Sequence, residues 1–203
     1  METFLDPTGP TDDLLKYTVE IVPLVEPDGE PGQPLGSFSV WRFNIGAHSD
    51  RAEHSLFQLF DDDSEEAADL FRALFEPNTE EYNMKVLGED ILFSDLLYFQ
   101  LAKMEKNVER SHILLAAAER VIQVLGSGCA FAALWLGDEP YPKQDGYALA
   151  DVLKFWEGQR DNEQFWGKIG FSRVPETLFL ARNLALCAPQ ISDILGDDSS
   201  EES

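Results

Sequence analysis

The residues that could carry chemistry are few and scattered along the chain. Ser111 stands next to His112, which suggests a nucleophile beside a base, but adjacent residues rarely align a hydroxyl with an imidazole, and no Gly-x-Ser-x-Gly elbow is present. Tyr141, Tyr147 and Glu105 are weak candidates for proton transfer. The alternative is that the two tyrosines are packing or loop residues and that Glu105 is a solvated loop acid.

Two segments have the composition of a metal site. His48 and His54 bracket Asp50 and Glu53, but their spacing matches no common zinc pattern, so a solvated loop is the favoured interpretation. Residues 61–66 (DDDSEE) lead directly into an apolar pattern with helical spacing. Helix capping and the helix dipole explain acidic residues at that position. The sequence therefore predicts no metal ion.

The charge balance is the most unusual bulk property. The chain carries 38 acidic and 15 basic residues, a formal net charge of −23. Nucleic-acid binding is disfavoured, because phosphate contacts need a basic face. Solubility is one explanation of the acidity, and attraction of a cationic substrate or docking on a basic protein are the others.

Length and composition predict one globular domain. The 203 residues are 44% hydrophobic and 11% aromatic, which is enough for a sizeable core. No apolar run approaches the roughly 20 residues of a membrane helix, and the start lacks a signal-peptide pattern, so a cytoplasmic protein without membrane contact is expected. Cys129 and Cys187 are expected to be reduced. The predicted organisation is a flexible leader (1–15), a domain (16–186) and a disordered acidic tail (187–203).

The stretch 95–136 positions the candidate residues. Residues 95–104 form a nearly continuous apolar run, typical of a strand covered on both faces. Apolar residues recur at helical spacing over 110–125, and a second apolar strand is predicted over 129–136. A strand, a crossover helix and a strand predict an α/β core with parallel strands. In such a unit, an anionic ligand is expected where the first strand ends and the helix begins.

Weaker patterns outline the remaining elements. An alternating pattern follows a stretch rich in turn formers, which predicts an early hairpin. The other elements are shorter, and each is predicted from apolar spacing between turn or helix-ending signals. The predicted ranges are strands 17–25 and 35–45, a helix over 67–75, a short strand within 82–93, helices over 147–156 and 161–169, and a last strand over 177–182.

Two segments resemble the GNAT superfamily of acyl-CoA-dependent N-acyltransferases. Residues 109–119 (ERSHILLAAAE), after the strand, are similar to that family's phosphate-binding loop and following helix. Residues 165–171 (FWGKIGF) resemble the late Phe-Tyr-x-Lys-x-Gly-Phe segment. The order of elements extends the resemblance over most of 17–184. Members of this superfamily often pair through their last strands, so 178–184 is expected to form the edge of a homodimer.

The resemblance implies both a fold and an activity. The fold is α/β (α+β), a mixed and centrally splayed sheet flanked by helices in a single domain. The activity is transfer of an acyl group, most often acetyl, from acetyl-CoA to an amine on a small molecule or a protein. The thioester would lie near the end of the strand 95–104, and the pyrophosphate on the helix start. The implied cofactor-binding residues are Leu101, Ala102, Met104, Arg110, Ser111, His112, Ile113 and Leu114.

The sequence departs from the family pattern at two functional positions. Aligning Arg110 with the family arginine places Ser111, Ile113 and Leu115 where three loop glycines are expected. Trp166 stands where many members have a tyrosine that protonates the leaving thiolate, and an indole N–H cannot do this at neutral pH. These departures favour an alternative: a catalytically inactive pseudoenzyme that serves as an acidic interaction module for a basic protein.

Overall fold

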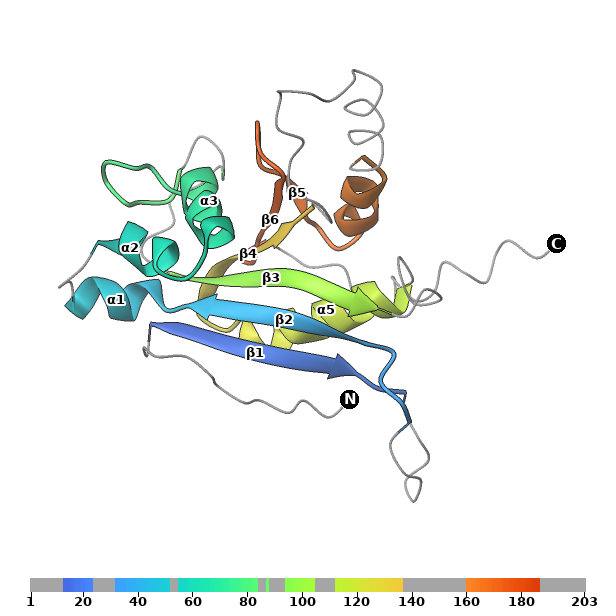
Figure 1. The fold of residues 1–203 in the computed structure, drawn as a ribbon. Coiled ribbons are helices and arrows are strands. Elements are labelled where there is room, and N and C mark those ends of the chain that lie inside the picture. The colour runs from blue at the N-terminus through green and yellow to red at the C-terminus, as the bar shows by residue number, and fades with distance from the viewer. Residues whose placement is uncertain are drawn as a thin grey trace, which may run out of the picture.

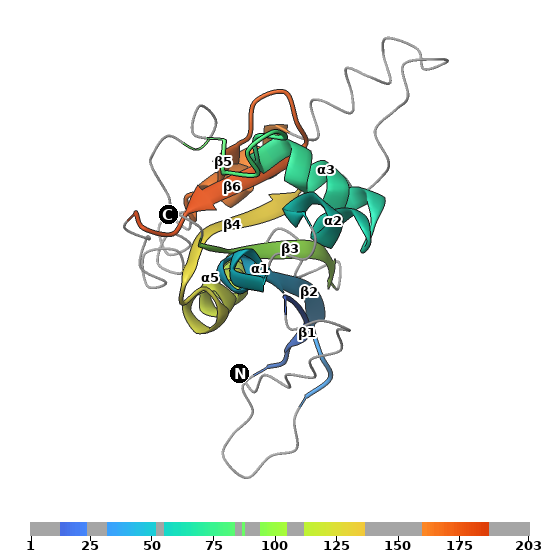
Figure 2. The ribbon, with the colours of Figure 1, turned by 90° about the vertical axis from the view of Figure 1, so that its left-hand side faces the viewer.

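The chain folds into a mixed sheet with helices packed on both of its faces (Figures 1 and 2). The computed structural model describes residues 13–23, 32–51, 55–83, 87, 94–104, 112–136 and 160–186. The strands are β1 (Leu14–Ile21), β2 (Gly36–Phe43), β3 (Asp95–Met104), β4 (Cys129–Trp135), β5 (Ser172–Arg173) and β6 (Phe179–Asn183). The helices are α1 (Ile45–Arg51), α2 (Leu56–Asp61), α3 (Glu65–Leu74), α5 (His112–Leu125) and a helix over 160–167.

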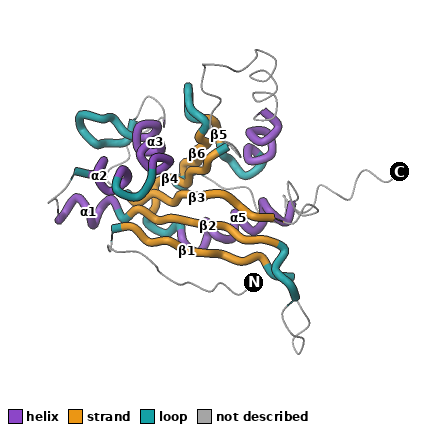
Figure 3. The backbone as a smooth tube through the Cα atoms, in the orientation of Figure 1, coloured by secondary structure: helices purple, strands orange, loops and turns teal. Residues whose placement is uncertain are grey.

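The strand order places the predicted strand–helix–strand unit at the centre of the sheet. Within the described residues the sheet has six strands in the order β1-β2-β3-β4-β6-β5. β3 and β4 are parallel, whereas the other neighbouring strands are antiparallel. Figure 3 shows the strands in orange and the helices around them in purple. The predicted α/β class with a mixed sheet is therefore confirmed, as is the parallel pairing of the two apolar strands.

β3 is apolar from Leu96 to Phe99 because helices cover both faces of this part of the strand. Leu96 and Tyr98 pack with α2 and α3, whereas Leu97 and Phe99 pack with α5 and with residues of the turn after helix 160–167. Alternate residues of a strand point to opposite faces, so a strand in this position has no solvent-facing side that would select polar residues. Figure 2 shows α3 and α5 on opposite sides of the sheet.

Helix α3 begins where the acidic segment meets the apolar pattern. The Ser64 hydroxyl caps the helix by accepting a hydrogen bond from the Ala67 backbone N–H at 3.2 Å. Glu65 and Glu66 occupy the first turn, where the helix dipole favours negative charge. The capping interpretation of this segment is confirmed, and the apolar side of α3 packs on the sheet.

Hydrogen bonds from Arg42 fix the carboxyl end of α5. The Arg42 guanidinium donates to the Asp95 carboxylate at 2.7 Å and to the Leu125 carbonyl oxygen at 3.1 Å. Arg42 therefore joins β2, the start of β3 and the last turn of α5. Beside it, burial raises the pKa of the Cys129 thiol to about 11, and the thiol is not in a disulfide. Because the carboxyl end of α5 is held at the start of β3, its first turn lies toward the other end of that strand (Figure 1).

Two expectations about the first half of the chain are wrong. β1 begins at Leu14, inside the predicted leader, because Leu14 pairs with Phe43 and is buried in the core on the α3 side. The second strand ends at Phe43, and His48 lies on α1 instead of in a solvated loop. The His48 ring is buried, and its Nδ1 atom is 3.2 Å from an Asp13 carboxylate oxygen.

The second half of the chain follows the predicted order with one correction. The short helix over 160–167 ends in a turn at Gly170, whose φ of 85° lies in the left-handed region that favours glycine. The predicted last strand is β6, but β5 pairs with Leu180 and Ala181, so this part of 178–184 is not at the edge of the sheet, and the expected homodimer stays a prediction. The strand predicted within 82–93 and the helix predicted over 147–156 fall largely or wholly outside the described residues, although Tyr82 forms an isolated bridge with Phe75.

Candidate functional site

The pairing of the two parallel strands ends at Phe99, in the middle of β3. Their pairing runs from Asp95 opposite Cys129 to Phe99 opposite Leu134, whereas β3 continues to Met104 along β2. The second half of β3 thus extends beyond its paired segment with β4. Because β4 ends at Trp135, the stretch of β3 beyond Phe99 has no β4 partner among the described residues, and this unpaired stretch in the middle of the sheet is called the opening below. Ligands of open α/β sheets bind at the carboxyl ends of such strands.

A β-bulge lies in this extended half of β3. Phe38 pairs with Ala102 and Ser39 pairs with Gln100, so Leu101 is an extra residue without a place in the regular ladder. Bulges redirect the local backbone and occur frequently beside active sites. Of the predicted cofactor-binding residues, Leu101, Ala102 and Met104 therefore lie along this segment, whose backbone the structure describes.

The first turn of α5 lies toward the same end of the sheet. His112 begins the helix, Ile113 has 46% of its surface exposed, and Leu114 is buried in the core on the α5 side. The Leu114 side chain is thus a core residue, and only its backbone is suited to the predicted phosphate contact. The amino end of a helix presents N–H groups without intrahelical partners, which is the feature that binds anions.

Aromatic rings connect helix 160–167 to the parting strands. Trp166 packs edge-to-face against Phe165 and Phe171, with ring centroids 5.5 Å and 5.9 Å away. Phe171 in turn meets Phe99, the last β3 residue paired with β4, at 6.5 Å. Trp166 is therefore a partly buried ring that packs against the core on the α5 side.

The α3 face of the sheet carries a buried tyrosine and a carboxylate, next to the last paired residues of β3. The Tyr98 hydroxyl, deep in the core, donates a hydrogen bond to the Glu66 carboxylate on the first turn of α3. Burial raises the pKa of Tyr98 well above its ordinary value, and the charge of Glu66 adds to the effect. The tyrosine therefore stays protonated and donates to Glu66, which is itself partly exposed.

A cavity of about 550 Å³ lies beside this pair at the end of β4. Three surfaces enclose it: α3, the last residue of β4, and the turn that joins β5 to β6. Its walls combine apolar side chains with three charged ones, and they are formed by Asp69, Arg72, Ala73, Trp135, Glu176, Thr177, Leu178 and Phe179. Trp135 follows Leu134, the last β4 residue paired with β3, so the cavity adjoins the place where the strands part.

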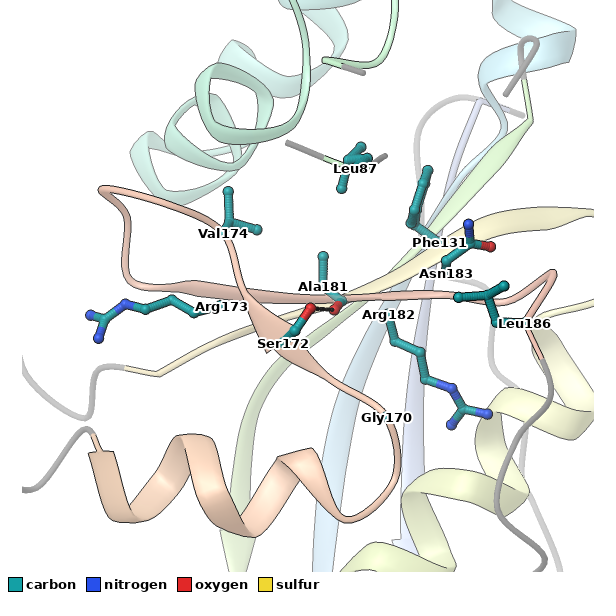
Figure 4. A pocket seen from close by; sticks show the side chains of 10 residues that line it. All are labelled: Leu87, Phe131, Gly170, Ser172, Arg173, Val174, Ala181, Arg182, Asn183 and Leu186. Carbon is teal, nitrogen blue, oxygen red and sulfur yellow. Dashed lines mark hydrogen bonds between the residues drawn. The ribbon is translucent and has the colours of Figure 1, made fainter. Parts of the chain in front are cut away.

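A smaller cavity of about 250 Å³ lies at the outer edge of the sheet (Figure 4). Leu87, Phe131, Val174 and Ala181 line one side, whereas the Arg182 side chain extends to the opposite face of β6. There Arg182 donates to Glu119 in an ion pair that is buried on both sides. Its charge is therefore paired with Glu119 on α5, and the polar residues of the lining are Ser172, Arg173, Arg182 and Asn183.

The predicted catalytic residues, and two of the predicted cofactor-binding residues, are not among those the structure describes. Glu105, Arg110, Ser111, Tyr141 and Tyr147 lie outside the described ranges. Sequence reasoning missed Glu66, because its position in an acidic helix start was fully explained by capping. Its partner Tyr98 gave the available signal, since a tyrosine in a strand covered on both faces needs a buried acceptor for its hydroxyl.

Comparison with known proteins found no matching family model, no matching curated protein and no matching solved structure. Within the described ranges, no three or more His, Cys, Asp and Glu side chains gather in a way that could hold a metal ion. None of the helices in the same ranges has the length and apolar composition needed to cross a membrane. The function of the site is therefore argued from its geometry.

Proposed function

We propose that the protein is a GNAT-like N-acyltransferase that moves an acetyl or other acyl group from acyl-CoA to an amine. One observation carries the proposal: the pairing of parallel strands β3 and β4 ends at Phe99, and β3 continues along β2 with a bulge at Leu101. A thioester in this opening would meet backbone groups that the bulge has released from the ladder. The first turn of α5 lies toward the same end of the sheet and supplies N–H groups for the pyrophosphate.

The reaction exchanges one bond for another. The amine nitrogen bonds to the carbonyl carbon, the carbon–sulfur bond breaks, and a proton passes from nitrogen to a base while the thiolate of coenzyme A departs. Coenzyme A supplies the acyl group in activated form. The protein positions the reactants and accepts the proton.

Glu66 is the base that we assign among the described residues. Its carboxylate lies beside Tyr98 on the α3 side of the opening, and the Tyr98 hydroxyl orients it. We expect Glu66→Gln to lower kcat by about a hundredfold or more, the usual contribution of a general base. The glutamine keeps an acceptor oxygen for Tyr98, so unchanged unfolding in urea separates a lost base from a lost fold.

Calorimetric titration with acetyl-CoA and with coenzyme A tests the proposal directly. Ile113→Glu adds a negative charge to the first turn of α5, where it would repel a pyrophosphate. Val124→Glu is the matched control, because Val124 has the same 46% exposure but lies in the last turn of the same helix. We expect micromolar binding by the parent chain and by Val124→Glu, with affinity at least tenfold weaker for Ile113→Glu.

A second function, an acidic interaction module, is favoured by the net charge of −23 and by the packed ring of Trp166. Such a module would bind a basic protein surface and release it as salt screens the exposed charges. Retention on immobilised polylysine that fades between about 0.05 and 0.5 M salt, with no heat on adding acetyl-CoA, would select this function over acyl transfer.

A further inference from the structure

The cavity beside α3 has walls suited to an organic cation. Trp135, Leu178 and Phe179 provide apolar surface, and the Trp135 and Phe179 rings meet edge-to-face at 4.8 Å. The carboxylates of Asp69 and Glu176 come from opposite walls, one on α3 and the other on the turn between β5 and β6. An alkyl chain can lie along such apolar surface while a terminal ammonium meets a carboxylate or an aromatic face.

The only cation in the described lining is paired with one of the two carboxylates and lies near an aromatic ring outside the lining. The Arg72 guanidinium forms an ion pair with Asp69 at 2.6 Å and lies 5.5 Å from the centre of the Phe57 ring. Two carboxylates against one guanidinium leave the lining with a net negative charge. The whole chain adds to this field with its net charge of −23, so the cavity attracts cations.

We propose that this cavity binds the acceptor of the acyl group and that the acceptor is an alkyl diamine. This inference rests on the proposed acyltransferase function. The ammonium that does not react is held by Asp69 and Glu176, and the carbon chain lies on Trp135. The reacting amine points toward the place where β3 and β4 part, because Trp135 adjoins the last paired residue of β4. A second positive charge thus distinguishes the acceptor from simple alkylamines.

Calorimetry with 1,4-diaminobutane, without any acyl-CoA, tests the cavity on the full chain. We expect the diamine to bind at least fivefold more tightly than 1-aminobutane, which has the same carbon chain and one ammonium. Asp69→Asn and Glu176→Gln should each weaken diamine binding about two- to fivefold, as expected for partly exposed ion pairs. The two substitutions together should weaken it about tenfold.

Two further variants test the direction of the change in diamine affinity and control for net charge. Arg72→Gln removes a positive charge from the same wall, so it should strengthen diamine binding, an effect that general destabilisation cannot produce. Glu20→Gln removes an exposed carboxylate from β1, at the opposite edge of the sheet, and should leave the affinity unchanged. Equal weakening by Glu20→Gln would assign the binding to net charge and overturn the inference.

The outcomes separate this inference from the proposed function. Selective diamine binding with no heat from acetyl-CoA would retain the cation site and reject the acyltransferase. Acetyl-CoA binding with acetylation of amines, but with no preference for diamines and no response to Asp69→Asn or Glu176→Gln, would retain the acyltransferase and overturn the diamine site. Tighter binding of an oligolysine peptide than of the diamine would overturn it in favour of a protein acceptor.

Discussion

The two faces of the sheet are packed in different ways. The face under α2 and α3 is filled with aromatic rings, including the stacked pair Phe43 and Phe60 at 4.0 Å and the stacked pair Phe71 and Phe75 at 4.9 Å. The face under α5 is mainly aliphatic, with leucine, valine, isoleucine and alanine side chains between the helix and the strands. Aromatic rings are larger and more rigid than aliphatic side chains. The two faces therefore leave differently shaped spaces between their side chains, and polar groups fit into them in different ways.

The polar groups follow the same division. On the α3 face, Glu66 meets the Tyr98 hydroxyl and Asp63 meets the Lys16 ammonium, which lies 4.4 Å from the centre of the Trp41 ring. Both carboxylates are partly open to solvent. On the α5 face, Glu119 and Arg182 form a sealed ion pair, with side chains 2% and 5% exposed. The α5 face thus seals its ion pair away from solvent, whereas the two carboxylates of the α3 face remain partly exposed.

The strongest test of this division is Arg182→Met. It leaves the buried Glu119 carboxylate without its cation, and a buried charge without a partner is costly. We expect a loss of about 3–5 kcal/mol in the free energy of unfolding, measured by urea denaturation. Glu119→Leu combined with Arg182→Met should recover most of the loss, because the pair itself contributes little beyond hydrophobic replacements. A double variant no better than the single one would show that the pair is needed for more than charge balance.

The turn that supports Arg182 offers the next largest effect. Gly170→Ala forces a side chain into the left-handed backbone conformation, with φ of 85°, while the added Cβ would meet Arg182 only at an ordinary 3.6 Å. The cost is therefore conformational, about 1–2 kcal/mol. Gly167→Ala is the control, since it lies at the end of helix 160–167 with no atom within 4 Å of the new Cβ. It should stabilise the chain by up to about 1 kcal/mol, and thermal melts of the two variants should shift in opposite directions.

Tyr98→Phe tests the polar group of the α3 face. Removing the hydroxyl that donates to Glu66 should cost about 1 kcal/mol at neutral pH, because the partly exposed carboxylate can turn to water. The folded pKa of Tyr98 is raised above the ordinary value of about 10, so the native state holds its proton when the unfolded chain releases it. The contribution of Tyr98 to the free energy of unfolding is thus fully present below about pH 10 and falls as the pH rises further.

Above about pH 10, the free energy of unfolding of Tyr98→Phe should fall less steeply with pH than that of the parent chain. Urea denaturation at a series of pH values measures both slopes. Part of this pH dependence should remain in both proteins, because burial also raises the pKa of Tyr82. Identical slopes for Tyr98→Phe and the parent chain would mean that Tyr98 is not shielded from water in solution, which would weaken the contrast between the two faces.

Local patterns predicted the centre of the fold, and tertiary contacts determined the remainder. The strand–helix–strand unit over 95–136 was predictable because the spacing of its apolar residues and the glycines that end its helix lie within one stretch of sequence. Helix α2 has a comparable local signal, since Ser55 and Gln58 form a capping box, but the preceding polar residues suggested a loop. The two-residue strand β5 has almost no pattern of its own and exists through its pairing with β6.

The site was less predictable than the fold. The strand opening was expected at the end of β3, but the bulge at Leu101 depends on the register with β2, which spacing alone does not fix. The cavity brings Asp69, Trp135 and Glu176 together from three parts of the chain. Glu66 satisfied a local rule for helix starts, and that rule concealed its longer-range contact with Tyr98.

The smallest expected effect concerns the two ends of α5 and separates binding from stability. A glutamate at position 113 places a negative charge near the positive end of the helix dipole, whereas one at position 124 places it near the negative end. Ile113→Glu should therefore be about 0.3–1 kcal/mol more stable than Val124→Glu, with equal apolar exposure lost in the two variants. Urea denaturation at low salt measures this difference, and about 1 M salt should reduce it. If Ile113→Glu is the more stable variant and yet the weaker binder of acetyl-CoA, its lost affinity reports a phosphate contact, because a damaged helix would lose stability as well.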